Sequence, residues 1–175
     1  MSRPDIQRLR PTLSDPDVQT AVWFLGALVT TRLDSSTTGD DLAVLEHRGR
    51  NGYNSPLHRH LHDDETFLVL DGEVELVADG EQHTARAGST VFLPKHTVHG
   101  FVVASSTARF LTLHNPGGFD RFTRRAGSPA VAGAVVGDDL ELPTGVVPPA
   151  PEELTRIAAS YGIEILGPPP VPRAA

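Results

Sequence analysis

The sequence predicts an all-β protein, a small barrel of two packed antiparallel sheets with a short C-terminal helix. Short apolar runs recur at a spacing of roughly 8–12 residues, which is typical of β-sandwiches and barrels. Glycine and proline, with 16 and 15 residues, fall mostly between these runs or in the C-terminal tail. Asp71-Gly72 and Asp79-Gly80 stand between alternating apolar segments, a strong signal for β-hairpins.

Size and composition limit the class of protein. A chain of 175 residues has the length of one domain and can bury a sizeable core. The absence of cysteine excludes disulfides, thiolate metal sites and a cysteine nucleophile. A net charge of −7 argues against a nucleic-acid partner. The apolar stretch 21–29 is too short to cross a membrane, and no signal-peptide layout precedes it, so we expect a soluble cytoplasmic protein.

The sequence divides into three sections: an N-terminal arm over residues 1–20, a barrel core over 21–115 and a C-terminal extension over 116–175. Within the core, β-branched and aromatic residues predict strands, and the cluster 34–40 predicts a turn. Gly26 marks a bulge or bend between the first two strands. The predicted strands cover 22–25, 28–31, 42–46, 66–70, 73–78, 90–93, 100–103 and 109–113.

The extension is mostly irregular. Residues 119–125 could form one or two helical turns, whereas 126–151 show no clear period. A helix is expected over about 151–161, because proline opens it, two glutamates occupy its first turn and Gly162 follows it. The proline-rich tail after it predicts a loose polyproline stretch.

One segment carries candidate metal ligands. His58 and His60 are two residues apart, so a strand would present both imidazoles to the same side. Glu65 follows a charged bend, and an antiparallel strand could return it beside them. His99, which comes after a short strand and a proline, could supply a third imidazole. Three imidazoles and one carboxylate suit Ni, Fe, Mn, Co, Cu or Zn and leave coordination positions open for water or substrate.

These residues resemble the two motifs of the cupin superfamily. The first, G-x5-H-x-H-x4-E-x6-G, is matched at every defined position, by Gly52, His58, His60, Glu65 and Gly72. The second, G-x5-P-x-G-x2-H-x3-N, is matched by Gly88, Pro94 and His99. It departs at His96, which replaces the usual glycine, and at Val103, which replaces the usual asparagine. The resemblance implies a cupin (jelly-roll) barrel with one divalent transition metal held by His58, His60, Glu65 and His99.

Within the cupins, the chain resembles bacterial single-domain proteins of the quercetin 2,3-dioxygenase type. The grounds are the single cupin core, the His-Asn-Pro-Gly-Gly-Phe run at 114–119 and the proline-rich C-terminus with its helix. This likeness implies a dioxygenase that acts on a small aromatic or enol, flavonol-like substrate. The glutamate that matches Glu65 would bind the metal and also accept the substrate hydroxyl proton. Cupins usually pair through sheet edges, so we expect a homodimer.

Two other functions fit the same residues. The metal could act as a Lewis acid in an isomerase, cyclase or hydrolase, with Glu65 or His96 moving protons. The protein could also bind a small molecule without turning it over. Activity under nitrogen would favour the first alternative, and tight binding without turnover the second.

The remaining polar and aromatic residues near the motifs have simpler interpretations. We expect His62 to be exposed or to support a ligand, and His96 either to line the mouth or to serve as a plain turn residue. Asp63 and Asp64 are read as a solvated bend. Three histidines lack ligand spacing and are assigned structural or surface positions: His47, His83 and His114. Most of the strand phenylalanines are expected in the core: Phe24, Phe67, Phe92, Phe101 and Phe110.

Overall fold

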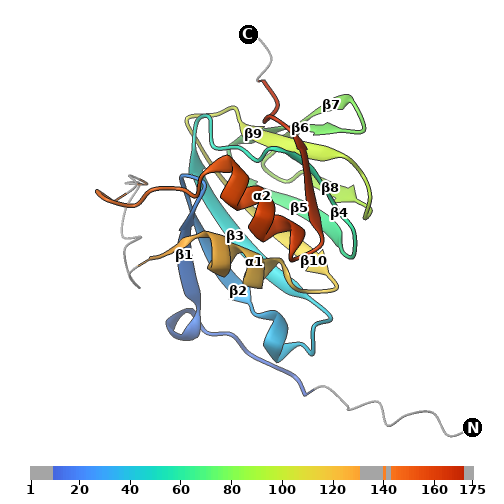
Figure 1. Cartoon of the computed structure of the whole chain (residues 1–175). Coiled ribbons are helices and arrows are strands. Elements are labelled where there is room, and N and C mark those ends of the chain that lie inside the picture. The colour runs from blue at the N-terminus through green and yellow to red at the C-terminus, as the bar shows by residue number, and fades with distance from the viewer. Residues whose placement is uncertain (1–9, 131–139, 141–142, 172–175) are drawn as a thin grey trace, which may run out of the picture.

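Two antiparallel sheets face one another in the computed structural model, which describes residues 10–130, 140 and 143–171 (Figure 1). The seven-stranded sheet has the order β11-β1-β2-β3-β10-β5-β8. Its strands are β1 (Thr20–Phe24), β2 (Ala27–Leu33), β3 (Ala43–Arg50), β5 (Asp64–Asp71), β8 (Thr90–Leu93), β10 (Thr107–Asn115) and β11 (Ser128–Pro129). This arrangement confirms the predicted fold class.

The five-stranded sheet has the order β12-β4-β9-β6-β7. Its strands are β4 (Leu57–His60), β6 (Glu73–Ala78), β7 (Glu81–Arg86), β9 (His99–Val103) and β12 (Ile163–Gly167). Two α-helices, α1 (Phe119–Ala126) and α2 (Pro151–Ala159), lie on one side of the barrel (Figure 1). Short 3-10 turns occur at Pro16–Val18 and Ser35–Thr37.

The predicted strands and the C-terminal helix are all present, and so is a strand that carries His58 and His60, but β7, β11 and β12 were not predicted. Most of β7 is exposed, so its sequence lacks the apolar alternation that marks a strand. Strand β12 follows α2 after the turn at Gly162 and pairs with β4. Of the two roles expected for Gly26, a bulge or a bend, the structure has the bend, because Gly26 forms the two-residue turn of the β1–β2 hairpin with Leu25. Parts of the predicted arm, irregular stretch and tail lie outside the described residues: 1–9, 131–139, 141–142 and 172–175.

The interior holds two clusters of buried apolar side chains. The sheet-sheet cluster lies between the two sheets and includes Phe67, Leu76, Phe101 and Phe110. The helix-sheet cluster joins β1, β2 and β3 to the buried faces of α1, α2 and β12, and includes Phe24, Leu45, Phe122, Leu154 and Ile157. Four of the five strand phenylalanines are buried, as expected for most of them, and the exception is Phe92, which is 60% exposed on the edge strand β8.

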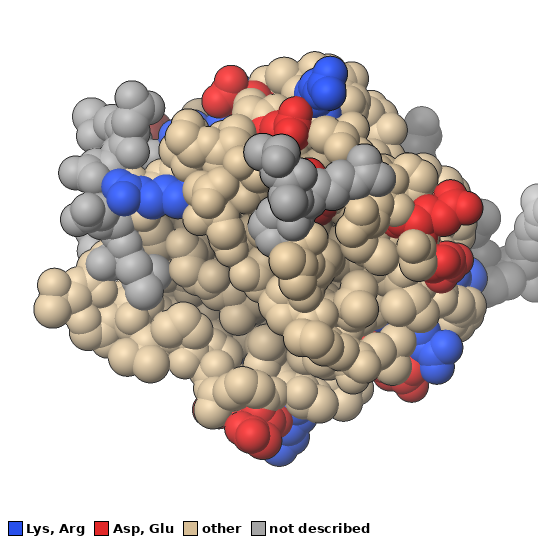
Figure 2. Space-filling view, turned by 90° about the horizontal axis from the view of Figure 1, so that it is seen from above, with Lys and Arg blue, Asp and Glu red and all other residues tan. Residues whose placement is uncertain are grey.

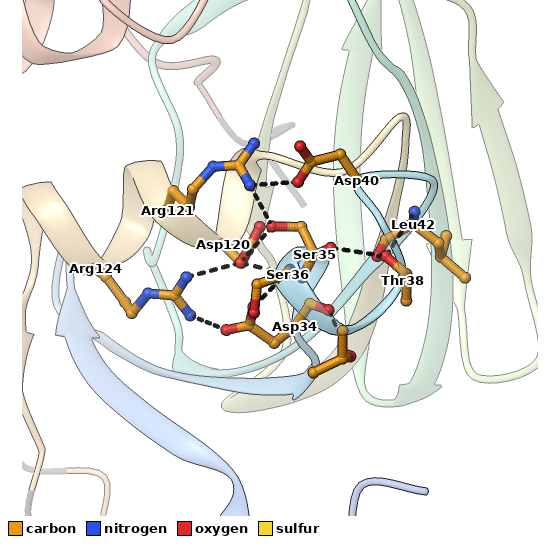
Figure 3. Close-up of polar contacts among 10 residues, drawn as sticks. Asp34, Ser35, Ser36, Thr38, Asp40, Leu42, Asp120, Arg121 and Arg124 are labelled. Atoms are coloured by element: carbon orange, nitrogen blue, oxygen red, sulfur yellow. Dashed lines mark hydrogen bonds and ion pairs between the residues drawn. The ribbon is translucent and has the colours of Figure 1, made fainter. Parts of the chain in front are cut away.

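Polar contacts fix α1 to the turn that follows β2 (Figure 3). The Asp120 carboxylate is fully buried and accepts hydrogen bonds from Ser35 Oγ and Arg124, each at 2.9 Å. Arg121 donates to Ser35 Oγ at 2.9 Å and to Asp40 at 2.6 Å. Hydrogen-bonded ion pairs that include a buried carboxylate hold the first turn of α1 in one place.

The described residues include no helix that is both long and apolar enough to span a membrane. Figure 2 shows one face of the molecule, on which acidic and basic residues are scattered among many uncharged ones.

A buried ion-pair group on β2 and β3 gives a prediction about acid stability. Glu46 is 4% exposed, and its carboxylate accepts from Arg32 at 2.7 Å and from Arg48 at 2.8 Å. Burial alone would raise the pKa of Glu46, but the two guanidinium groups outweigh it and hold the pKa below its ordinary value of 4.5. The stability that this carboxylate contributes is therefore present above about pH 4.5 and lost as the pH falls through its lower folded pKa.

Accordingly, we predict that Glu46→Gln lowers the free energy of unfolding at pH 7 by about 1–3 kcal/mol. The loss should shrink as the pH falls below 4.5 towards the lower folded pKa of Glu46, because the wild-type carboxylate then takes up a proton as well. Urea denaturation of the wild type and the variant at several pH values measures this difference in the free energy of unfolding. The control Glu81→Gln changes a carboxylate whose side chain is 83% exposed and should have little effect. Equal effects of the two variants would contradict the prediction.

Candidate metal centre

Three histidines and one glutamate converge in the space between the two sheets. His58 and His60 are alternate residues of β4, and both side chains are buried. His99 begins β9 and lies directly opposite His58 in the β4–β9 pair. Glu65 reaches the group from β5, a strand of the facing sheet. One donor atom from each of the four lies within 4.8 Å of all the others.

Backbone carbonyls orient two of the imidazole rings. His58 Nδ1 lies 2.8 Å from the carbonyl oxygen of Pro56, and His99 Nδ1 lies 2.9 Å from that of Thr97. A carbonyl oxygen only accepts, so each Nδ1 must carry a proton and donate. In the neutral rings, Nε2 of His58 and of His99 therefore holds a lone pair. Such outer hydrogen bonds fix the tautomer of metal-binding histidines.

The polar atoms of the group are not satisfied by one another. His99 Nε2 is 2.9 Å from Glu65 Oε2, where a neutral imidazole and a carboxylate would place two lone pairs face to face. A proton or a cation has to lie between them. His60 is 2% exposed, yet neither of its ring nitrogens makes an aligned hydrogen bond. Buried polar atoms without partners are rare, and a cation bound between the rings and Glu65 would satisfy His60 Nε2.

Charge and burial set the protonation of the group without a metal. Burial, helped by the neighbouring His99 and His60, lowers the pKa of His58 to about 3. Burial also opposes the charge of His60, but Asp63 and Glu65 outweigh it and raise the pKa of His60 to about 10. Burial raises the pKa of Glu65, but the nearby imidazoles of His114, His60 and His99 outweigh burial and hold this pKa well below the ordinary value. The site is therefore built around an ionised carboxylate.

The donor set matches a transition-metal site. Imidazole nitrogen suits Zn, Cu, Fe, Ni and Co, and one carboxylate is compatible with each of these and with Mn. Four protein donors are fewer than an octahedral ion accepts, so positions for water or substrate would stay open. The structure brings together all four residues selected from the sequence, and their unsatisfied donor atoms fit a cation.

Two residues beside this group make contacts that the sequence did not predict. Asp63 was expected in a solvated bend but is 9% exposed, with Oδ2 lying 3.0 Å from His60 Nδ1 and 2.8 Å from His114 Nδ1. His114 faces Glu65 in the β5–β10 pair, with Nε2 3.5 Å from Glu65 Oε1. Asp63 thus links His60 to His114, which in turn contacts Glu65. Strand pairing creates this contact, and the spacing of His114 in the sequence carries no sign of it.

The other histidines lie outside the group of four donors. His62 and His83 are exposed, and His47 is buried between Tyr53 and Thr112. His96 is an exposed turn residue with φ of +73°, the left-handed conformation that glycine adopts most easily. Its backbone N–H donates to the His60 carbonyl at 2.8 Å. The turn after β8 therefore accommodates histidine in a conformation that favours the usual glycine of the motif.

A narrow chamber adjoins His58 and Glu65. Its volume is about 40 Å³, and it lies between the sheet-sheet and helix-sheet clusters, with walls drawn from both. The walls are mainly apolar and include Phe24, Leu25, Tyr53, Phe67, Phe101, Phe119, Phe122, Leu154, Ile163 and Ile165. This lining, mostly apolar with a few convergent polar groups, is typical of small-molecule sites, but the volume is much smaller than theirs.

Part of the chain is similar in sequence to known proteins. The family described as Cupin domain matches residues 46–114. Quercetin 2,3-dioxygenase of Bacillus subtilis (strain 168) is 32% identical over 85 residues, which cover 49% of this chain and 25% of that protein. An uncharacterized protein of Aquifex aeolicus (strain VF5) is 36% identical over 59 residues, 34% of this chain and 49% of that one. The matches thus span between a quarter and half of these curated relatives.

Solved structures agree in fold. The polyketide cyclase RemF from Streptomyces resistomycificus superposes with a TM-score of 0.52 at 22% identity, over 62% of this chain and 81% of that one. An RmlC-like cupin from Shewanella frigidimarina NCIMB 400 gives 0.54 at 17% identity, over 64% and 96%. At these identities the likeness concerns the barrel alone.

Removal of one candidate ligand tests the site. We predict that His58→Ala weakens the binding of Co(II) or Ni(II) at least about ten-fold, because an imidazole nitrogen is lost from the donor set. The control His62→Ala removes a nearby exposed imidazole from outside the group and should bind metal like the wild type. Calorimetric titration of the metal-free proteins measures both, and equal affinities would contradict the assignment.

The Asp63 bridge gives a second prediction. Asp63→Asn should lower metal affinity by about 10–100-fold, because His60 and His114 lose the negative charge of the carboxylate that they share, and the remaining amide oxygen is a weaker, neutral acceptor. The neighbouring Asp64→Asn serves as the control, since Asp64 accepts from the backbone of Lys95 and contacts no histidine of the group. Unchanged affinity in Asp63→Asn would show that the bridge does not support the site.

Proposed function

Because this chain carries a cupin domain and so belongs to the cupin superfamily, we propose that it is a metal-dependent dioxygenase of the quercetin 2,3-dioxygenase type. Its substrate would be a small aromatic or enol-bearing molecule. The observation that carries the proposal is the group of three imidazoles and one carboxylate, which lies between the sheets and borders an apolar chamber. The similarity to the Bacillus subtilis enzyme supports the choice of reaction.

His58, His60, Glu65 and His99 would hold the metal. When bound there, a divalent transition metal supplies a Lewis acid that polarises a coordinated substrate oxygen. The chain contributes rigid placement of the donors, because three of them come from neighbouring strands of one sheet and the fourth from the facing sheet. Preorganised donors avoid the cost of reorganisation during the reaction.

Glu65 would also accept the proton of the substrate hydroxyl. Its side chain is 4% exposed and borders the chamber, so its carboxylate can reach a hydroxyl proton of a molecule in that space. Of the two carboxylate oxygens of Glu65, Oε1 lies 3.5 Å from His114 Nε2. His114 and Asp63 would therefore keep the carboxylate oriented, and Oε2 would accept the proton of the substrate hydroxyl.

Once a side chain of its wall has moved to widen it, the chamber would hold the apolar part of the substrate and exclude water. Phe67 and Phe101 come from the two facing sheets, and Phe119 and Phe122 come from α1. Aromatic walls pack well against a planar ring. Within a dry cavity, the interaction between the carboxylate and a substrate hydroxyl is stronger than in water.

Oxygen uptake tests the proposal. Protein loaded separately with Ni, Fe(II), Mn, Co and Cu is mixed with a flavonol such as quercetin, and dioxygen consumption is recorded. We expect uptake that matches substrate loss, and Glu65→Gln should reduce the rate by about 10²–10⁴-fold through loss of the proton acceptor. The control Glu81→Gln, at an exposed carboxylate, should retain the rate.

Failure of every metal to support uptake would reject the dioxygenase. Turnover of a substrate under nitrogen would instead indicate a Lewis-acid isomerase, cyclase or hydrolase at the same site. Tight binding of the flavonol without turnover would indicate a binding protein.

A further inference from the structure

A wider apolar groove adjoins the chamber on the outside of the molecule. It has a volume of about 540 Å³ and lies beside the start of α2, the end of β12 and the turn of the β1–β2 hairpin. Prolines form much of its wall: Pro148, Pro149, Pro151, Pro168 and Pro169. Five residues line both the groove and the chamber: Leu25, Asn54, Pro56, Leu154 and Ile165. The groove therefore leads towards the space beside His58 and Glu65.

The chamber is too small for a ring-bearing molecule in the observed conformation. Its 40 Å³ compares with the roughly 150 Å³ of a dry protein cavity that accepts benzene. A substrate with an aromatic ring can reach the metal site only if a side chain of the wall moves. The residues shared by groove and chamber stand where that movement would open the passage.

Leu25 has two features that the other shared residues lack. It packs against both the sheet-sheet and the helix-sheet clusters, so its side chain lies at their junction. It also has φ of +51° in the two-residue turn with Gly26, a conformation that is unfavourable for leucine and usual for glycine, asparagine or aspartate. Strained backbone of this kind persists where the surroundings hold it, often at functional sites.

We propose that Leu25 is a specificity-determining residue that closes the passage from the proline-walled groove to the candidate metal centre. The molecule that passes is the small, largely apolar substrate of the proposed function, on which this inference rests. The apolar lining of both spaces favours such a molecule over a charged one. Displacement of the Leu25 side chain admits the ring, and its return excludes water.

A second route competes with this one. A cleft of about 420 Å³ lies beside His60 and Asp63, and it shares Phe119 and Ile163 with the chamber. Its wall includes His62, Arg121 and Ser160, so it is more polar than the groove. If the substrate entered from this side, Phe119 and not Leu25 would control its access.

The test compares Co(II)-loaded wild type with Leu25→Ala, Phe119→Ala and the matched control Leu166→Ala. Leu166 is 51% exposed on β12 and lines neither space. Azide and 4-phenylimidazole serve as a small and a large metal-binding probe. The visible spectrum of Co(II) reports the binding of each probe. Leu25→Ala should bind 4-phenylimidazole about ten-fold more tightly than the wild type, with azide unchanged. Equal binding in Leu25→Ala and Leu166→Ala, or a gain confined to Phe119→Ala, would overturn the inference.

A second measurement does not depend on the metal. Benzene is titrated into the metal-free proteins and followed by NMR, and Leu25→Ala should bind it at least about ten-fold more tightly than wild type or Leu166→Ala. Leu25→Gly should behave in the same way and preserves the hairpin, because glycine adopts the required φ without strain. Failure of wild-type protein to bind Co(II) would reject the proposed function, whereas absence of a benzene effect in both Leu25 variants would reject the role of Leu25.

Discussion

A carboxylate buried between two sheets is the constraint on which the rest of the structure depends. Glu65 would be costly in an apolar interior without opposite charge, since burial disfavours its ionised form. His60 and His99 approach it from the facing sheet and His114 from the strand beside it. The β4–β9 and β5–β10 registers set these contacts, so the barrel must close in one way for the charge to be compensated.

The two clusters of apolar side chains place this charged group in a defined environment. The sheet-sheet cluster lies on one side of the chamber, and α1, α2 and β12 complete the other side. The C-terminal extension is therefore part of the candidate site, because it supplies Leu154, Ile163 and Ile165 to the chamber wall. The contacts of Asp120, Arg121 and Arg124 hold α1 against the turn after β2, which maintains Phe119 beside His114.

The sequence predicted most of the barrel because its strands alternate apolar and polar residues and its turns contain Asp-Gly. It did not reveal β7, whose side chains face solvent, or β12, whose strand character depends on pairing with β4. His58, His60, Glu65 and His99 could be selected because their spacing forms motifs. The roles of Asp63 and His114 could not be predicted, since these residues meet only when distant strands pair. The position of Leu25 depends likewise on the meeting of two clusters.

The central claim is that three imidazoles and one carboxylate bind a single metal ion. X-ray absorption spectroscopy of protein loaded with one equivalent of Ni(II) or Co(II) tests this most directly, because imidazole rings give a characteristic outer-shell scattering. We expect one ion per chain, ligated by nitrogen and oxygen only, with about three imidazoles. An ion surrounded by water and carboxylate oxygen, without imidazole scattering, would contradict it.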